Sequence, residues 1–379
     1  MTQALLNGRI LTPDGFVTGH AVIIDSGRIS AIVLETAIPA DCERFDLGGG
    51  TLVPGFIDVQ VNGGGNRLFN DDPSVDTIAA IGSAHRRFGT TGFLPTLISD
   101  DESRIAAALD AVRSAIAAGV PGVLGVHIEG PFLNPAKKGI HDRAKLRAIS
   151  ASEIELLSNP VDGATVLTLA PETVEPEVLR RLADAGVLIC AGHTAATADE
   201  IANALGNGLR GFTHLFNAMS QLTAREPGVV GAALLDDRSW CGIIVDGHHV
   251  DPRVLKISLR AAPLRRFMLV TDAMPSVGGR KAFTLNGEPI TVEDGRCVNA
   301  AGTLAGSDLD MASAVRNAVT LLDVDLADAV AMASSNPAAF LQLDGEFGRI
   351  APGYRASLVL LDEELNVTES WIDGVRANF

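Results

Sequence analysis

GVLGVHIEGPF, residues 122–132, sets the architecture of the chain, because an apolar run leads directly to a polar residue. The β-branched first part is typical of a parallel strand that is buried on both faces. Glu129 stands where this strand ends, and His193 and His214 stand at the ends of two later runs of the same kind. In eight-stranded α/β barrels, polar residues at the C-terminal strand ends carry the chemistry.

Strand-like runs alternate with helical segments through the middle of the chain. The predicted strands are 52–60, 91–97, 122–129, 165–172, 187–193, 211–216, 241–247 and 266–273. Amphipathic, Ala-rich segments such as 103–119 and 176–186 lie between them. This alternation predicts the α/β class and a (β/α)8 TIM barrel. A doubly wound open sheet is the alternative, but GGG at 63–65 lacks the G-x-G-x-x-G pattern that usually follows its first strand.

The two ends of the chain have a different, β-rich pattern. Residues 1–50 alternate apolar and polar positions between the turns Asn7-Gly8 and Asp14-Gly15, and residues 346–379 show short strands and an Asp-Gly turn. We expect both termini to form one small β-sandwich domain beside a barrel at 51–345.

One segment of the barrel region departs from the strand–helix alternation. Residues 283–306 contain the turn pairs Asn286-Gly287 and Asp294-Gly295. This pattern predicts a β-hairpin insertion after the eighth strand, near the barrel mouth.

Composition narrows the classes of partner and location. The formal charge is −16 and no Lys/Arg-rich run occurs, which argues against nucleic acid or a membrane surface as partner. No apolar run approaches the roughly 18 residues of a membrane span. Four scattered cysteines and no visible secretion signal favour a cytoplasmic protein. An anionic substrate would need a local clamp, because the net charge gives it no attraction.

Polar residues end all eight predicted strands: Gln60, Thr96, Glu129, Glu172, His193, His214, Asp246 and Asp272. Any single one is explained by a satisfied buried group, but eight at one barrel face indicate a site. Glu129, His193 and His214 form a ligand set typical of a catalytic divalent ion with an open position. Asp272 is placed to take a proton from water, with a helix N-cap as its structural alternative.

The end of the first strand lacks an expected pair of ligands. A barrel enzyme that binds two metal ions might be expected to carry His-x-His there, whereas this chain has Gln60 and Asn62. Neutral amides bind such ions poorly compared with imidazole. We therefore expect one divalent ion per chain, Zn²⁺ first, with Fe²⁺, Co²⁺ and Mn²⁺ as alternatives, and the two amides as bystanders or water-holders. His127 is either a support for the metal or a satisfied core residue.

Several motifs occur in order along the whole chain, and together they carry a resemblance: PGFIDVQVNG (54–63), HIEGPF (127–132), AGHT (191–194), THLFNAM (213–219), REPGVVGA (225–232), VDGHHVD (245–251), TDAM (271–274) and LAGS (304–307). The chain resembles the N-acetylglucosamine-6-phosphate deacetylase family of the amidohydrolase superfamily. The resemblance implies a barrel with a β-sandwich, and hydrolysis of the acetamide of N-acetyl-D-glucosamine 6-phosphate to D-glucosamine 6-phosphate and acetate.

The resemblance also implies residue roles. Glu129, His193 and His214 become the metal ligands, Asp272 the general base and then acid, and His141 the hydrogen-bond donor to the amide carbonyl. The other implied substrate contacts are Gln60, Ile140, Asn217, Ala218, Arg225, His249, Leu304, Ala305 and Gly306.

Arg225 and His249 are the implied phosphate clamp, approaching from the neighbouring subunit of a homodimer. The residues alone support other interpretations. The Lys-rich neighbours of His141 favour a solvent-exposed loop, and Arg225 could form a surface ion pair with Glu226. Another amidohydrolase, such as a cyclic amidase or an N-acyl-amino-acid deacylase, and a non-catalytic barrel scaffold stay as alternative functions.

Overall fold

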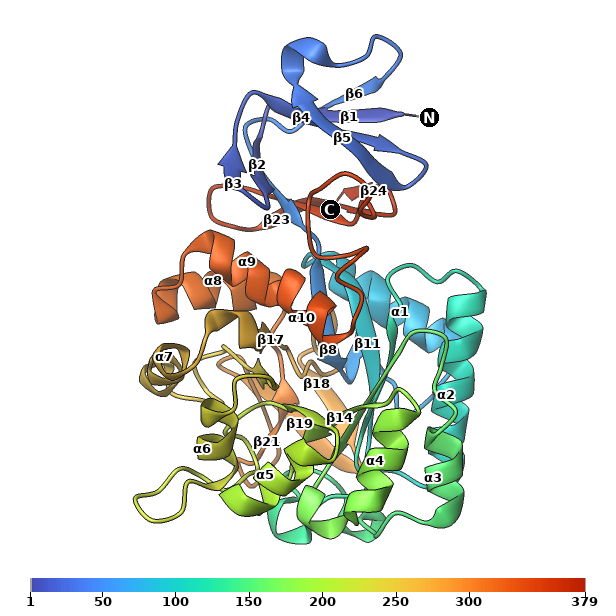
Figure 1. Cartoon of the computed structure of the whole chain (residues 1–379). Helices are drawn as coiled ribbons and strands as arrows, with labels where there is room; N and C mark the ends of the chain where they lie inside the picture. Colours follow the sequence, from blue (N-terminus) through green and yellow to red (C-terminus); the bar gives the residue numbers. More distant parts are fainter. Residues whose placement is uncertain (1, 379) are drawn as a thin grey trace.

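An eight-stranded parallel sheet forms the centre of the molecule (Figure 1), a computed structural model that describes residues 2–378. Its strands, in sheet order, are β8 (Phe56–Val61), β11 (Thr90–Ile98), β12 (Gly125–Glu129), β13 (Ala164–Leu169), β14 (Leu188–Ala191), β15 (Leu209–Phe212), β16 (Trp240–Ile243) and β17 (Phe267–Leu269). Each overlaps one predicted strand, so the predicted α/β barrel class is confirmed. The strands are almost wholly buried, as their continuous apolar runs require.

Contacts between the first strand and the residues beyond the last one close the barrel. The backbone N–H of Asp272 donates to the Gln60 carbonyl (3.0 Å), and Val61 forms a parallel bridge with Ala273. The carboxylate of Asp58 accepts from the hydroxyl and the N–H of Thr271. Closure therefore joins Gln60 and Asp272, two residues that are 212 positions apart in the sequence.

Helices follow the strands in chain order and cover the outside of the sheet (Figure 1). They are α1 (Val75–Arg86), α2 (Glu102–Ala117), α3 (Ala151–Leu157), α4 (Pro176–Asp184), α5 (Ala198–Gly206), α6 (Gly228–Leu235), α7 (Pro252–Ala261), α8 (Met311–Leu322), α9 (Leu326–Ala333) and α10 (Ser335–Phe340). Their buried faces and the barrel strands form one large apolar core. No helix within residues 2–378 has the length and apolar character needed to cross a membrane.

The termini together form the small β domain that was predicted, stacked on one end of the barrel (Figure 1). One sheet has four strands: β1 (Gln3–Leu6), β4 (His20–Asp25), β5 (Arg28–Leu34) and β6 (Glu43–Asp46). The other has six: β2 (Arg9–Thr12), β3 (Gly15–Val17), β7 (Thr51–Pro54), β22 (Leu358–Leu361), β23 (Val367–Ile372) and β24 (Val375–Asn378). A separate apolar cluster around Trp371 fills this domain.

The predicted first strand, 52–60, is divided at Gly55 into two strands. β7 pairs with β2 and β22 of the terminal sheet, and β8 pairs with β11 of the barrel. A Cβ at Gly55 would lie 2.0 Å from Thr91 Oγ1, so the chain passes too close to β11 for any side chain. The apolar pattern continues across the junction because both halves are buried, which is why the sequence alone predicts one strand.

Two small sheets lie near the ends of the barrel strands. β9 (Gly63–Gly64) pairs with β10 (Arg67–Leu68) directly after β8. The segment expected as a hairpin forms a four-stranded antiparallel sheet of β18 (Ala282–Leu285), β19 (Glu288–Glu293), β20 (Arg296–Val298) and β21 (Leu304–Ser307). Both Asn286-Gly287 and Asp294-Gly295 have the positive φ angles of a tight hairpin turn.

Gly125, the first residue of β12, provides a stability test of the barrel. Its φ is +151°, and an added Cβ would lie 1.9 Å from the Ala164 carbonyl oxygen, so Gly125→Ala must displace backbone between β12 and β13. We expect the free energy of unfolding to fall by about 3 kcal/mol. Gly206→Ala is the control, because its Cβ would meet nothing within 4 Å. Denaturant unfolding of both variants checks the prediction, and equal stabilities would contradict it.

Candidate metal centre and active site

Glu129, His193 and His214 meet at one point inside the barrel mouth. Glu129 ends β12, and the two histidines lie two residues beyond β14 and β15. The Nε2 atoms of His193 and His214 lie 3.2 Å and 2.9 Å from Glu129 Oε1. All three residues are at most 5% exposed, and their ligand atoms lie within 4.8 Å of one another. The structure thus brings together the predicted ligands, which are separated by up to 85 positions in the sequence.

The donor atoms fit a divalent cation. The two Nε2 atoms face each other at 3.1 Å, a distance that leaves one lone pair opposed to another unless a proton or a cation lies between them. His193 Nδ1 is 2.8 Å from the Lys137 carbonyl, which can only accept, so Nε2 is left unprotonated toward Glu129. Burial alone would raise the pKa of Glu129, but the neighbouring imidazoles of His193 and His214 hold that pKa well below its usual range.

The backbone is unusual where these side chains leave the strands. His193, His214 and Asp272 have φ angles of 50°, 31° and 53°, a region that residues other than Gly occupy uncommonly. Such conformations persist where the surrounding structure over-determines them, and they cluster at functional sites. The turn at each strand end directs its side chain into the common cavity.

Asp272 lies beside the candidate ligands and is held by the two amides that replace His-x-His. Its Oδ1 accepts from Asn62 Nδ2 (2.6 Å) and Gln60 Nε2 (3.2 Å), and Gln60 Nε2 also donates to Glu129 Oε2 (3.1 Å). Burial, and then the charge of Glu129, raises the pKa of Asp272 to about 7. Gln60 and Asn62 thus both donate to the Asp272 carboxylate. Their expected role as bystanders or water-holders stays a prediction.

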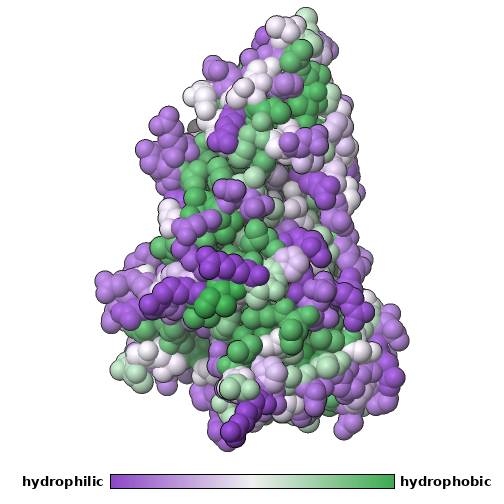
Figure 2. Space-filling model, turned by 60° about the vertical axis from the view of Figure 1, so that its left-hand side comes forward, coloured by the Kyte–Doolittle hydropathy of each residue, from purple (hydrophilic) through white to green (hydrophobic). Residues whose placement is uncertain are grey.

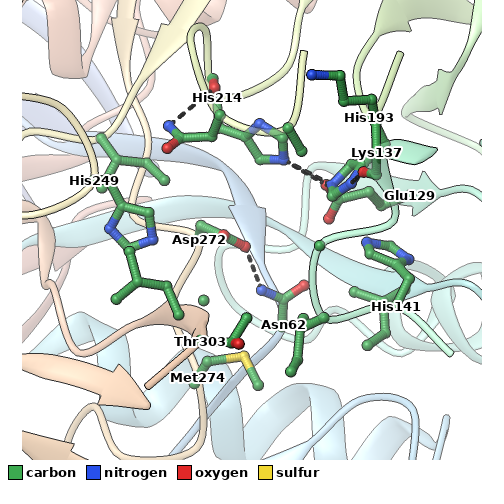
Figure 3. Close-up of a pocket in the computed structure, with 18 of the residues that line it drawn as sticks. Asn62, Glu129, Lys137, His141, His193, His214, His249, Asp272, Met274 and Thr303 are labelled. Carbon is green, nitrogen blue, oxygen red and sulfur yellow. Dashed lines mark hydrogen bonds and ion pairs between the residues drawn. The ribbon is translucent and has the colours of Figure 1, made fainter. Parts of the chain in front are cut away.

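A cavity of about 530 Å³ opens in front of these groups (Figure 3). Most of the predicted site residues line it: Glu129, Ile140, His141, His193, His214, Asn217, Ala218, His249, Asp272, Leu304 and Gly306. Its volume suits a small ligand of the size of a sugar phosphate. Three predicted contacts do not line it, namely Gln60, Arg225 and Ala305, of which Ala305 packs inside the β18–β21 sheet.

His141 lies in the cavity wall and is 2% exposed, so the solvent-exposed interpretation of its Lys-rich segment is wrong. Its ring packs against that of His193, with the centroids 4.4 Å apart. Burial, and then the charge of His193, lowers the pKa of His141 to about 3, which favours a neutral imidazole. The buried residue Ser99 contacts its Nδ1, and the sequence analysis did not single out this partner.

Of the two residues of the implied phosphate clamp, His249 lines the cavity and Arg225 does not. His249 lines the cavity of its own chain, which corrects the expectation that it arrives from a neighbouring subunit. Asp246 orients it: Oδ2 lies 2.6 Å from His249 Nδ1, and Oδ1 accepts from the His249 N–H. Arg225 is exposed in the loop before α6. Lys137, which the sequence analysis did not single out, adds a positive charge to the cavity wall.

Other strand-end residues have structural partners. His127 Nδ1 lies 3.0 Å from the Val59 carbonyl and Nε2 lies 2.7 Å from Thr168 Oγ1, so it is a satisfied core residue. Glu172 accepts from Thr194 Oγ1 and from the Ala195 N–H. Glu172 therefore braces the turn that carries His193, and it does not line the cavity.

The sequence and the structure of this chain were compared with those of known proteins, and the matches agree with a barrel that carries a metal site. Residues 51–377 match the amidohydrolase family and residues 3–52 match the NagA composite domain. N-acetylgalactosamine-6-phosphate deacetylase of Shewanella sp. (strain ANA-3) is 43% identical, over 98% of this chain and 95% of that protein. The solved N-acetylglucosamine-6-phosphate deacetylase of Pasteurella multocida is 33% identical, with a TM-score of 0.97 over 100% of both chains. A variant of the Mycobacterium smegmatis N-acetyl-D-glucosamine-6-phosphate deacetylase, solved in complex with N-acetyl-D-glucosamine-6-phosphate, is 31% identical, with a TM-score of 0.89 over 99% and 98% of the chains.

The chain belongs to the amidohydrolase family, since the family match and the barrel with its strand-end cluster agree. Its relatives at 43%, 33% and 31% identity are all amino-sugar-6-phosphate deacetylases, and the NagA composite domain is shared. Within the amidohydrolases it therefore belongs to the NagA-type branch.

Metal analysis tests the candidate centre. We expect one divalent ion per chain in the purified protein, because the amides at Gln60 and Asn62 already bind Asp272 and Glu129. Glu129→Gln removes the anionic ligand with little change of shape, so the ion should be lost on dialysis. His248→Ala, at an exposed position, is the control and should retain it. Two tightly held ions per chain, or full retention by Glu129→Gln, would refute the assignment.

Proposed function

We propose that the protein hydrolyses the acetamide of an N-acetylhexosamine 6-phosphate, giving acetate and the free amino sugar phosphate. The observation that carries this proposal is the convergence of Glu129, His193 and His214 beside Asp272 in one cavity. An ion held by these three ligands, Zn²⁺ first and Fe²⁺, Co²⁺ or Mn²⁺ otherwise, would make hydroxide available near neutral pH. The family membership supports hydrolysis over a scaffold role.

Asp272 is proposed as the general base and then the general acid. Its Oδ1 is occupied by two amide donors, so Oδ2 is the atom left to take a proton from water. Once Asp272 has taken the proton, the water oxygen would add to the amide carbon, the carbon–nitrogen bond would break, and Asp272 would return the proton to the leaving nitrogen. His141 donates to the carbonyl oxygen as negative charge develops there.

Two epimers of the sugar are candidate substrates. The sequence motifs led to N-acetyl-D-glucosamine 6-phosphate, and the two solved relatives named above carry that substrate in their names. N-acetyl-D-galactosamine 6-phosphate is the second candidate, because the relative of 43% identity is named for it. The two sugars differ only at C4, so the acetamide chemistry proposed for Asp272 and His141 is the same for both.

A homodimer is proposed to complete the phosphate site. Arg225 lies on an exposed loop and does not line the cavity of its own chain, which favours a contact with the cavity of a second copy. Large exposed apolar side chains gather on the same loop and on α6 and α7, which pack together: Leu222 (60% exposed), Leu235 (78%) and Ile257 (63%). Figure 2, which brings this side forward, shows hydrophobic surface between hydrophilic side chains. Apolar surface of this kind favours a subunit interface.

Two further proposals concern the domain boundary and the cellular location of the protein. We propose a β domain from both termini, with its junction to the barrel moved from residue 50 to Gly55, since β7 belongs to the terminal sheet. The four cysteines are free and buried, which supports a reducing, cytoplasmic compartment.

Acetate release from a panel of sugars tests the function. After metal loading, we expect turnover of N-acetylhexosamine 6-phosphates and little turnover of the unphosphorylated sugars, with the two epimers compared by kcat/KM. Asp272→Asn is the matched control, because it should keep the metal and lose most turnover. Equal turnover of phosphorylated and unphosphorylated sugars would contradict the proposed substrate, and an active Asp272→Asn would contradict the proposed base.

Arg225→Ala tests the phosphate contact and the dimer together. Loss of a charge-assisted contact should raise KM about tenfold to a hundredfold with little change in kcat. Arg238→Ala is the control, since its side chain is 85% exposed and lies away from the cavity. Light scattering should give the mass of a dimer. A monomer with an unchanged KM in Arg225→Ala would overturn both proposals.

A further inference from the structure

Ser99 lies directly behind His141 and outside the cavity. It is the residue after β11, and its exposed fraction is 6%. The side chain of Asn70 binds the backbone of Ile98, the residue before Ser99. It donates to the Ile98 carbonyl (2.9 Å) and accepts from the Ile98 N–H (3.0 Å). The backbone that presents Ser99 to His141 is therefore held in place on β11.

Two groups of Ser99 meet one nitrogen of the imidazole. Ser99 Oγ lies 2.7 Å from His141 Nδ1, and the Ser99 backbone N–H donates to the same atom at 3.3 Å. A backbone N–H can only donate, so Nδ1 has to present its lone pair. The serine hydroxyl, which can either donate or accept, then donates as well. In a neutral imidazole only one nitrogen bears hydrogen, and that nitrogen is Nε2.

The surroundings favour this arrangement over a rotated ring. A Cβ at Gly130 would lie 2.3 Å from Ser99 Oγ, so the glycine after Glu129 leaves the space that the hydroxyl occupies. The His141 ring also packs against the ring of His193, and it faces the cavity next to Glu129 (Figure 3). His141 Nε2 has no hydrogen-bond partner within residues 2–378, which leaves its hydrogen for a ligand in the cavity.

We propose that Ser99 is a positioning residue that holds His141 in the tautomer with hydrogen on Nε2, so that the imidazole donates to the substrate carbonyl. The proposal rests on the proposed function, in which His141 polarises the acetamide. Ser99 does not line the cavity, so it acts through His141 and not on the substrate. With the opposite tautomer, Nε2 would present a lone pair to the carbonyl oxygen and repel it.

Nitrogen NMR tests the tautomer without any substrate. The Zn²⁺-loaded protein is labelled with ¹⁵N-histidine, and the His141 signals are identified by their loss in His141→Gln. We expect a protonated Nε2 and an unprotonated, hydrogen-bonded Nδ1. In Ser99→Ala the Nδ1 signal should shift toward that of a free lone pair. A protonated Nδ1 in the unmodified protein would overturn the proposal, whatever the activity of the enzyme.

A double-mutant cycle tests whether Ser99 affects catalysis through His141. Ser99→Ala should lower kcat about fivefold, the size of one net hydrogen bond, with KM little changed. In a His141→Ala background it should have no further effect. Ser258→Ala is the control, a buried serine whose hydroxyl donates to the Val254 carbonyl in α7.

The outcomes separate the two proposals. Equal losses from Ser99→Ala in both backgrounds, or an unchanged kcat in Ser99→Ala, would overturn the role of Ser99. Full activity of His141→Ala would instead overturn the role of His141 in the proposed function, and the NMR result would still report the tautomer.

Discussion

The contact between the first barrel strand and the segment after the last one is the constraint on which the site depends. The Asp58 carboxylate binds Thr271, the Gln60 carbonyl accepts from the Asp272 N–H, and the amide of Asn62 donates to the Asp272 side chain. The same bonds close the barrel and aim Asp272. A barrel that failed to close here would lose its proposed base together with its fold.

Burial determines the electrostatics of this region. Desolvation raises the pKa of Asp58 to about 7, although Thr271 and the Gln60 N–H donate to it. Glu129 is equally buried, but two imidazoles lower its pKa. Two carboxylates in similar surroundings therefore differ in proton affinity because of the donors around them. The net charge of −16 gives an anionic ligand no long-range attraction to the chain. Such a ligand would instead meet positive or hydrogen-bond-donating groups in the cavity wall, among them His249 and Lys137.

Three parts of the candidate site are oriented by neighbours that do not line the cavity. Asp246 orients His249, Glu172 braces the turn of His193, and Ser99 faces His141. These supports explain how the backbone at His193 and Asp272 can stay in a rarely occupied conformation. Each of these supports is joined to its site by a hydrogen bond, as buried polar groups usually are.

The sequence by itself determined the eight strands, the Glu129–His193–His214 set and the absence of His-x-His, because strand periodicity and residue chemistry are local properties. Only the tertiary structure decided the rest. It divided the first strand at Gly55, buried His141 and left Arg225 outside the cavity that His249 lines. It also made Gln60 and Asn62 donors to Asp272. These outcomes depend on which distant residues become neighbours when the barrel closes, and a single sequence carries no direct record of such contacts.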